Sequence, residues 1–166
     1  MQRCFIALGS NQADPAAQVT RAFSELRNLP QSQLLACSSL YRSAPLGPQD
    51  QPAFINAVAM LDTLLSPEAL LDALQHIELN AGRVRKAERW GPRILDLDLL
   101  LYADQMIDTP RLQVPHYHMH ARSFVLYPLA ELAADLIMPD GTTLQDLLDA
   151  CPPAGLARLS GFTAQG

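Results

Sequence analysis

The stretch RWGPRILDLDLLLY, residues 89–102, passes from a loop into a strand. Gly91-Pro92 is a turn signal, and the alternation after it predicts a strand over Ile94–Tyr102. Successive side chains of a strand point to opposite faces, so Asp96 and Asp98 are expected to share one face. The other face is expected to meet the core through Leu95, Leu97, Leu99 and Leu101.

Before this strand, the chain carries patterns for three further strands. They are predicted at Cys4–Leu8, Leu34–Arg42 and Phe54–Leu61, which are apolar runs bounded by turn residues. Alternation in the third run would place one set of side chains on a common face, namely Phe54, Asn56, Val58 and Met60.

Two helices are marked by their ends. Asp14 is expected to cap a helix that begins at Pro15 and stops before Pro30. Ser66-Pro67 opens the second helix, which is expected to end at Gly82. Their core stripes would be Val19, Ala22, Phe23, Leu26 and Leu29 in the first, and Leu70, Leu74 and Ile77 in the second.

The order strand, helix, strand, strand, helix, strand is typical of an α+β, ferredoxin-like sandwich with an antiparallel sheet. Two helices expected near Arg122–Leu126 and Leu144–Ala150 would be C-terminal additions to this βαββαβ core. We expect one domain over residues 1–166, since this length suits a single sizeable core.

Composition excludes several classes of protein. No apolar run approaches the roughly 18 residues of a membrane span, so no membrane partner is expected. Cys4, Cys37 and Cys151 lack CxxC spacing, which indicates neither a disulfide framework nor a zinc site and favours a reducing cytoplasm. A net charge of −5 argues against nucleic-acid binding. We find no heptad or interface stripe and expect a monomer.

Basic residues are nevertheless concentrated in one segment. Five of the 12 lysines and arginines lie within it: Arg83, Arg85, Lys86, Arg89 and Arg93. A dense basic segment in an acidic protein fits a local anionic ligand, although a solvated charged loop would produce the same pattern.

The acidic pair directly follows this segment. Asp96 and Asp98 would lie about 6–7 Å apart along the strand, where they repel unless a cation lies between them. Carboxylate oxygens suit Mg²⁺, although a solvated polar strand face is the alternative. Carboxylates beside arginines are the groups that phosphoryl transfer uses. The sequence has no GxxxxGK[ST] or GxGxxG motif, and Lys86 is the only lysine, so a P-loop kinase and a dinucleotide fold are excluded.

These residues resemble a known signature. Residues 89–93 followed by Asp96-Leu97-Asp98-Leu99-Leu100 are similar to the signature of the 6-hydroxymethyl-7,8-dihydropterin pyrophosphokinases of folate biosynthesis. The resemblance runs in order from about residue 4 to residue 145. Its other blocks include Gly9-Ser10-Asn11, Tyr41-Arg42-Ser43, Phe54-Ile55-Asn56-Ala57 and Val114-Pro115-His116.

The resemblance implies the ferredoxin-like fold and a reaction in which the pterin hydroxyl attacks the β-phosphorus of ATP and AMP leaves. It implies that Asp96 and Asp98 hold two Mg²⁺ ions, with ATP as co-substrate and the pterin as the other partner. It assigns Arg83 and Arg93 to catalysis, on a loop that closes over the site.

The resemblance also assigns binding residues. The positions that match ATP contacts are Gln75, Glu78, Arg85, Lys86, Trp90, Arg111, His116, Tyr117 and Arg122. Those that match pterin contacts are Ser43, Pro45, Leu46, Phe54, Asn56, Trp90 and Phe124. Phe54 and Phe124 would stack on the two sides of the ring and Asn56 would bind its amidine-like edge. Without the resemblance, both phenylalanines would be read as core residues.

Two other functions fit parts of the pattern. A metal-dependent hydrolase could use the same acid pair with a water nucleophile, but it would not need Phe54, Phe124 and Asn56. A ferredoxin-like binding module without catalysis would leave Asp96 and Asp98 unexplained. No residue stands out as a general base, and polarisation of the hydroxyl by a metal ion is one hypothesis.

Overall fold

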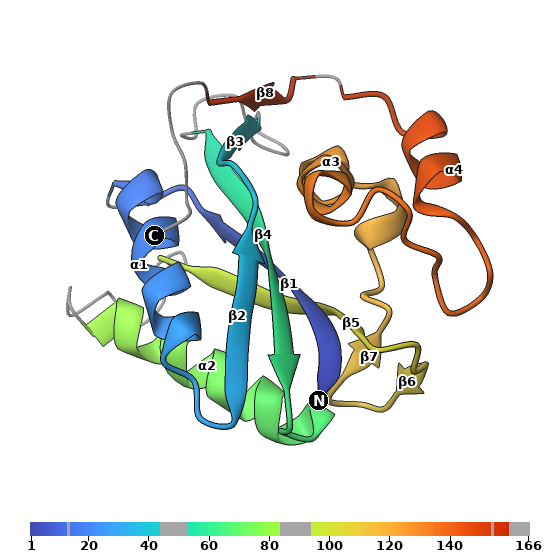
Figure 1. The fold of residues 1–166 in the computed structure, drawn as a ribbon. Helices are drawn as coiled ribbons and strands as arrows, with labels where there is room; N and C mark the ends of the chain where they lie inside the picture. Colours follow the sequence, from blue (N-terminus) through green and yellow to red (C-terminus); the bar gives the residue numbers. More distant parts are fainter. Residues whose placement is uncertain (13, 44–52, 84–93, 154, 160–166) are drawn as a thin grey trace.

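The computed structural model describes residues 1–12, 14–43, 53–83, 94–153 and 155–159. Within these residues, one antiparallel sheet has the strand order β5-β1-β4-β3-β8, and β2 also pairs with β4 (Figure 1). Its strands are β1 (Gln2–Ser10), β2 (Ser32–Cys37), β3 (Tyr41–Ser43), β4 (Phe54–Thr63), β5 (Asp96–Tyr102) and β8 (Ala157–Arg158). The predicted ferredoxin-like order is therefore confirmed, with β2 and β3 together in the place of the second strand.

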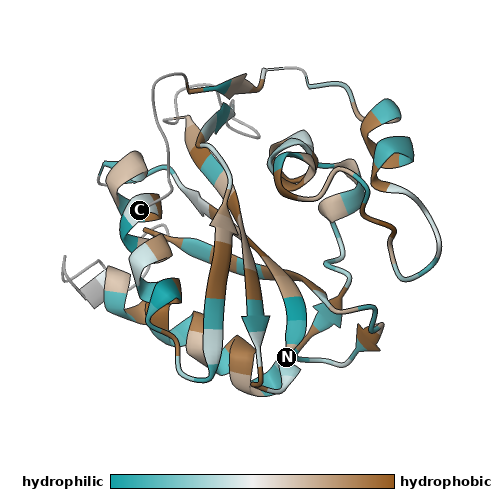
Figure 2. Ribbon diagram, viewed as in Figure 1, coloured by the Kyte–Doolittle hydropathy of each residue, from teal (hydrophilic) through white to brown (hydrophobic). Residues whose placement is uncertain are grey.

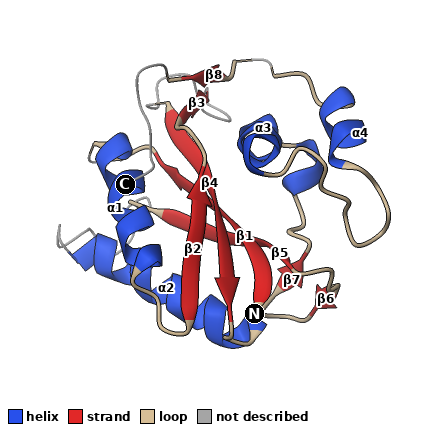
Figure 3. Cartoon of the chain, in the orientation of Figure 1, coloured by secondary structure: helices blue, strands red, loops and turns tan. Residues whose placement is uncertain are grey.

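The helices form layers on both faces of this sheet. α1 (Pro15–Arg27) and α2 (Pro67–Arg83) lie together on one face, and α3 (Ser123–Leu132) lies across the other (Figure 3). The remaining elements are β6 (Ile107–Asp108), β7 (Gln113–Val114), the 3₁₀ turn η1 (Met119–Ala121) and α4 (Leu144–Asp149). In Figure 2, α1, α2 and α4 carry both hydrophilic and hydrophobic segments, as expected of helices with one buried face.

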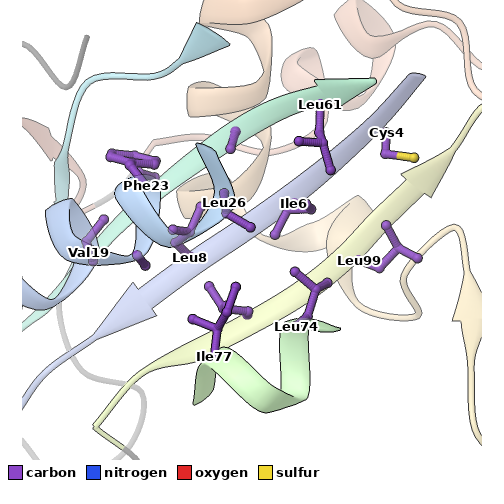
Figure 4. Packing of buried hydrophobic residues seen from close by; sticks show 14 of the residues in the cluster. Cys4, Ile6, Leu8, Val19, Phe23, Leu26, Leu61, Leu74, Ile77 and Leu99 are labelled. Atoms are coloured by element: carbon purple, nitrogen blue, oxygen red, sulfur yellow. The ribbon is translucent and has the colours of Figure 1, made fainter. Parts of the chain in front are cut away.

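The first core lies between the sheet and α1 and α2. Side chains of both helices point toward β1 and β5 in Figure 4, and the predicted stripes meet there. Phe23, Leu26 and Leu74 are almost fully buried in it. The apolar period of the two helices thus predicted the covered face correctly.

The second core lies under α3 and contains Phe5, Val58, Leu126 and Leu129. Leu101 also belongs to it, so the prediction that Leu101 shares a face with Leu95, Leu97 and Leu99 is wrong. The reason is a register shift between β1 and β5, where Phe5 pairs with Leu101 but Ile6 pairs with Leu99. One extra residue in a strand reverses the side-chain alternation after it.

Two local expectations also need correction. α1 begins at Pro15 as predicted, but Asp14 has φ 62° and its side chain makes no capping hydrogen bond. The single strand predicted over Leu34–Arg42 is divided into β2 and β3. Between them the Ser38 hydroxyl donates to Ser39 O and accepts from Val58 N, so a side chain takes a place in the backbone ladder.

α2 runs to Arg83, one residue beyond the predicted end. β6 and β7 form a small hairpin that the sequence reading missed, because strands of two residues carry no periodic pattern. Every helix among the described residues is too short or too polar to cross a membrane.

Candidate active site

A cleft opens on the α3 side of the sheet, with a cavity of about 180 Å³. Eight of the predicted site residues line it: Ser43, Phe54, Asn56, Asp96, Asp98, His116, Arg122 and Phe124. They come from β3, β4, β5, the segment after β7 and the start of α3. Residues far apart in the sequence are thus brought together around one small cavity.

The acidic side of the cleft is the start of β5. Asp96 pairs with Gly9 of β1 and Asp98 pairs with Ala7, so both carboxylates point to the cleft face, as strand alternation predicts. The Asp98 side chain keeps 48% of its surface exposed, which leaves its oxygens accessible to a ligand.

Glu78 supports this strand from outside the cleft. β5 is an edge strand, and Leu97 N, between the two aspartates, donates to Glu78 Oε2 at 2.8 Å. This bond satisfies an outward-facing N–H that no strand among the described residues covers. Glu78 therefore fixes the backbone that carries the acid pair.

His116 stands beside the acid pair. Its backbone N donates to Leu100 O at 3.0 Å, and its Nδ1 accepts from His118 N at 3.3 Å. This leaves the proton of the neutral ring on Nε2, which lies 3.8 Å from Asp98 Oδ1. Burial lowers the pKa of His116, and this effect outweighs the opposing charge of Asp98. The lowered pKa favours the neutral ring, whose Nε2 lies on the side of the Asp98 carboxylate.

The rest of the cleft carries two aromatic side chains and one oriented amide. Asn56 Nδ2 donates to Ser43 Oγ at 2.7 Å, and both side chains are buried. Phe54 and Phe124 line the same cavity, and the Arg122 guanidinium lies 5.6 Å from the centre of the Phe124 ring. An oriented amide in the same cavity as aromatic side chains can select a flat ligand with donors and acceptors on its edge.

Besides Glu78, three of the predicted nucleotide contacts that the structure describes lie outside the residues that line this cavity. Arg111 binds α2 through Glu68 at 2.8 Å, through Asp72, and through Gln75 at 3.3 Å. Arg111 and Gln75 thus form one surface group. Tyr117 is 66% exposed and packs edge-on against His118. His118 is exposed, and among the described residues no three groups that could bind a metal ion come together.

Other predicted site residues fall outside the described part of the chain: Pro45, Leu46, Arg85, Lys86, Trp90 and Arg93. Arg83 is the last residue of α2, and its side chain is likewise not described. The roles assigned to these residues stay predictions.

The cavity also has apolar lining residues that the sequence reading did not assign, namely Ala7, Leu8, Leu100 and Val125. Alternation could have found Leu100, because it shares a face with Asp96 and Asp98. Ala7 carries no local signal and is recognisable only from its pairing with Asp98 across β1 and β5.

The carboxylate oxygens at the cleft are suitable ligands for magnesium. Asp96 and Asp98 supply hard carboxylate oxygens on one face of one strand, and Asp98 is half-exposed. Magnesium usually takes one or two protein carboxylates and completes its shell with phosphate oxygens and water. Two carboxylates at an open cleft therefore suit a metal ion that arrives with a phosphate ligand.

Fold and cleft together define an α+β, ferredoxin-like protein whose two strand carboxylates line the same cavity as two phenylalanines and a buried amide. The family model for 7,8-dihydro-6-hydroxymethylpterin-pyrophosphokinase (HPPK) matches residues 5–134. The chain belongs to this family.

Curated relatives agree over nearly the whole chain. The 2-amino-4-hydroxy-6-hydroxymethyldihydropteridine pyrophosphokinase of Pseudomonas aeruginosa is 60% identical over 161 residues, covering 97% of this chain and 99% of that relative. The protein of the same name from Haemophilus influenzae is 49% identical over 148 residues, covering 89% of this chain and 92% of that relative.

A solved structure is similar in fold. The crystal structure of wild-type Plasmodium falciparum HPPK-DHPS with SDX-DHP superimposes with a TM-score of 0.71 at 12% identity. The match covers 95% of this chain and 47% of the Plasmodium chain. The chain thus spans less than half of that protein, and the likeness concerns the fold alone.

Proposed function

We propose that this chain transfers diphosphate from Mg·ATP to the hydroxymethyl group of 6-hydroxymethyl-7,8-dihydropterin, forming the pterin diphosphate and AMP in folate biosynthesis. The observation that carries the proposal is the cleft itself, where Asp96 and Asp98 lie beside Phe54, Asn56 and Phe124. Family membership and relatives that bear the name of this activity support it.

The cleft residues would divide into two groups. Asn56, oriented by Ser43, would bind the polar edge of the pterin, while Phe54 and Phe124 would stack on its faces and exclude water. This arrangement would hold the hydroxymethyl group toward the acidic side of the cleft. The reaction between the pterin and ATP would then be effectively unimolecular within the complex.

On the acidic side, Asp96 and Asp98 would hold magnesium, for which we propose two ions. Bound magnesium neutralises phosphate charge. His116 would donate a hydrogen bond from Nε2 to a phosphate oxygen, and Arg122 would add positive charge at the cleft. Gln75, Glu78, Arg111 and Tyr117 stay predicted ATP contacts.

The proposal also includes a lid, the basic segment of residues 83–93, which would close over the site. Arg83 and Arg93 would stabilise phosphate charge in the transition state, with Arg85, Lys86 and Trp90 close to the nucleotide. Pro45 and Leu46 would contribute to the pterin side. We also propose that residues 1–166 act as one domain and a monomer in the cytoplasm.

Two other functions fit the cleft less well. A hydrolase would use the acid pair but gain nothing from Phe54, Asn56 and Phe124. A binding module would need the aromatic side but not two carboxylates opposite it.

The test is product analysis with purified protein, Mg·ATP and 6-hydroxymethyl-7,8-dihydropterin. AMP should form only when the pterin is present and should vanish in the variant Asp96→Ala/Asp98→Ala. Release of ADP, or of free phosphate without the pterin, would instead indicate an ordinary kinase or a hydrolase and would refute the proposal.

A further inference from the structure

A single carboxylate near the end of α3 binds the sheet beside the cleft. Glu131 Oε1 accepts from the Tyr41 hydroxyl at 2.8 Å, and its two oxygens accept from Ser39 N at 3.1 and 3.0 Å. The Ser39 hydroxyl donates to Oε2 at 3.0 Å, and the Arg158 guanidinium lies 3.6 Å from the same oxygen. Glu131 thus joins α3 to three segments: the β2–β3 connection, β3 and β8.

Every one of these partners is a hydrogen-bond donor. An ionised carboxylate only accepts, so it can satisfy Ser39, Tyr41 and Arg158 together. A glutamine would turn an NH₂ group toward donors and lose at least one of the bonds. The Glu131 side chain is 23% exposed, which makes these charge-assisted bonds stronger than those of an open surface pair.

On the helix side, Glu131 and Phe124 lie on the same face of α3. Seven positions separate them in the sequence, which is about two helical turns. A residue at this spacing points in nearly the same direction as its partner. The rotation of α3 that Glu131 fixes is therefore also the rotation that directs Phe124 into the cleft.

On the sheet side, Tyr41 and Ser43 share one face of β3, and both are buried. Tyr41 pairs with Asn56 in the ladder, and Ser43 accepts the hydrogen bond that orients the Asn56 amide. α3 lies beside this end of β4, next to β3 (Figure 1). The bond from Tyr41 to Glu131 therefore fixes the distance between α3 and the strand that orients Asn56.

We propose that Glu131 is a positioning residue that sets the width and alignment of the heterocycle-binding half of the cleft. It would do so by holding α3, with Phe124, against β3, with Ser43. Calling the heterocycle a pterin rests on the proposed function. Asp96, Asp98 and His116 lie on other elements, and Arg122 is the member of the acidic half that adjoins α3, so this half should depend on Glu131 much less than the heterocycle-binding half does.

The test compares binding of the two substrates in Glu131→Gln, Tyr41→Phe and the control Tyr127→Phe. Tyr127 is also on α3, but its hydroxyl donates to Cys151 O at 3.1 Å, outside the residues that line the cleft. The dissociation constant of the pterin is measured with saturating Mg²⁺ and α,β-methylene-ATP, which blocks transfer, and that of the nucleotide without pterin. Thermal unfolding of each variant is recorded alongside.

Glu131→Gln should weaken pterin binding roughly tenfold and Tyr41→Phe roughly threefold, with nucleotide binding changed less than about twofold. Tyr127→Phe should lower the melting temperature yet leave pterin binding unchanged. Equal losses for both ligands, an unchanged pterin constant in Glu131→Gln, or a matching loss in Tyr127→Phe would overturn the inference. If Glu131→Gln does not fold, Tyr41→Phe decides by the same criteria.

Failure of the proposed function would look different. A wild-type protein that binds the pterin but forms no AMP would refute the proposed reaction, while the binding comparison would still decide for or against Glu131.

Discussion

Asn56 lies against the backbone of Gly9, its partner in the β1–β4 ladder. A Cβ atom at position 9 would lie 3.2 Å from Asn56 Oδ1, closer than ordinary van der Waals contact. The glycine therefore leaves room for the amide that Ser43 orients.

Gly9→Ala should displace the Asn56 amide and weaken pterin binding. We expect the dissociation constant to rise about fivefold, since crowding a packed group costs about 1 kcal/mol or more. Isothermal titration measures it. Gly82→Ala is the matched control, because a Cβ there meets nothing within 4 Å. Unchanged affinity in Gly9→Ala would show that the Asn56 amide does not need the space that Gly9 leaves.

Asp98 is predicted to act on turnover more than on pterin binding. Asp98→Asn keeps the size of the side chain but removes the charge that a metal–phosphate group requires. We expect kcat to fall roughly 100-fold or more, while pterin affinity changes less than about threefold. Rapid-quench kinetics and equilibrium binding provide the two numbers. Equal losses in both would contradict the role given to Asp98.

At the scale of elements, β5 is an edge strand whose position depends on α2 through Glu78 and Leu97 N. Residues that orient metal ligands indirectly usually affect metal affinity strongly. A change at Glu78, on α2, should therefore alter the affinity of Asp96 and Asp98, on β5, for a metal ion.

Glu78→Ala should raise the Mg²⁺ concentration for half-maximal activity roughly tenfold, because the start of β5 loses its tether. Glu78→Gln retains an acceptor for Leu97 N and should stay within about threefold of wild type. Magnesium titrations at fixed ATP and pterin compare the two variants. If Glu78→Ala needs no more magnesium than Glu78→Gln, the tether has no such role.

Elements could be predicted from the sequence when the residues that determine them lie within the element itself. The helices carry proline at or near their starts and long apolar stripes, so α1 and α2 were found nearly to the residue. The break between β2 and β3 depends on a bond from Val58 to the Ser38 hydroxyl, 20 positions away in the sequence. The reversal of side-chain direction at Leu101 depends on the register in which β5 pairs with β1. Such long-range effects have no counterpart in a local pattern.

At the scale of the whole molecule, the sheet separates two cores, and the cleft opens beside the one under α3. Alternation alone predicted that Asp96 and Asp98 share a face, and likewise Phe54 and Asn56. That these faces meet across β1 required the pairing of all three strands. The resemblance supplied this connection for Phe124 and His116, but nothing in the sequence indicated Glu131.

The stability of the fold should decline in alkaline solution. Burial raises the pKa of Cys4 from 9.0 to about 12 and that of Cys37 from 9.0 to about 11. Burial and the bond to Glu131 raise the pKa of Tyr41 from 10.0 to about 12. Because these folded-state pKa values exceed the unfolded ones, their contribution is complete below about pH 9 and is lost as pH rises toward 12.

Urea unfolding between pH 8 and pH 11 checks this expectation. The free energy of unfolding should be level near pH 8 and then fall, by up to about 1.4 kcal/mol per pH unit for each group. Cys37→Ala should make the decline shallower. A constant free energy up to pH 11 would contradict the buried thiols and Tyr41 as its source.

The most direct test of the proposed reaction is ³¹P NMR of the complete mixture of protein, Mg·ATP and 6-hydroxymethyl-7,8-dihydropterin. Our account predicts AMP and a pterin diphosphate, with two mutually coupled phosphorus signals, in equal amounts. ADP with a pterin monophosphate would mean that only the terminal phosphate moves, and it would contradict the account.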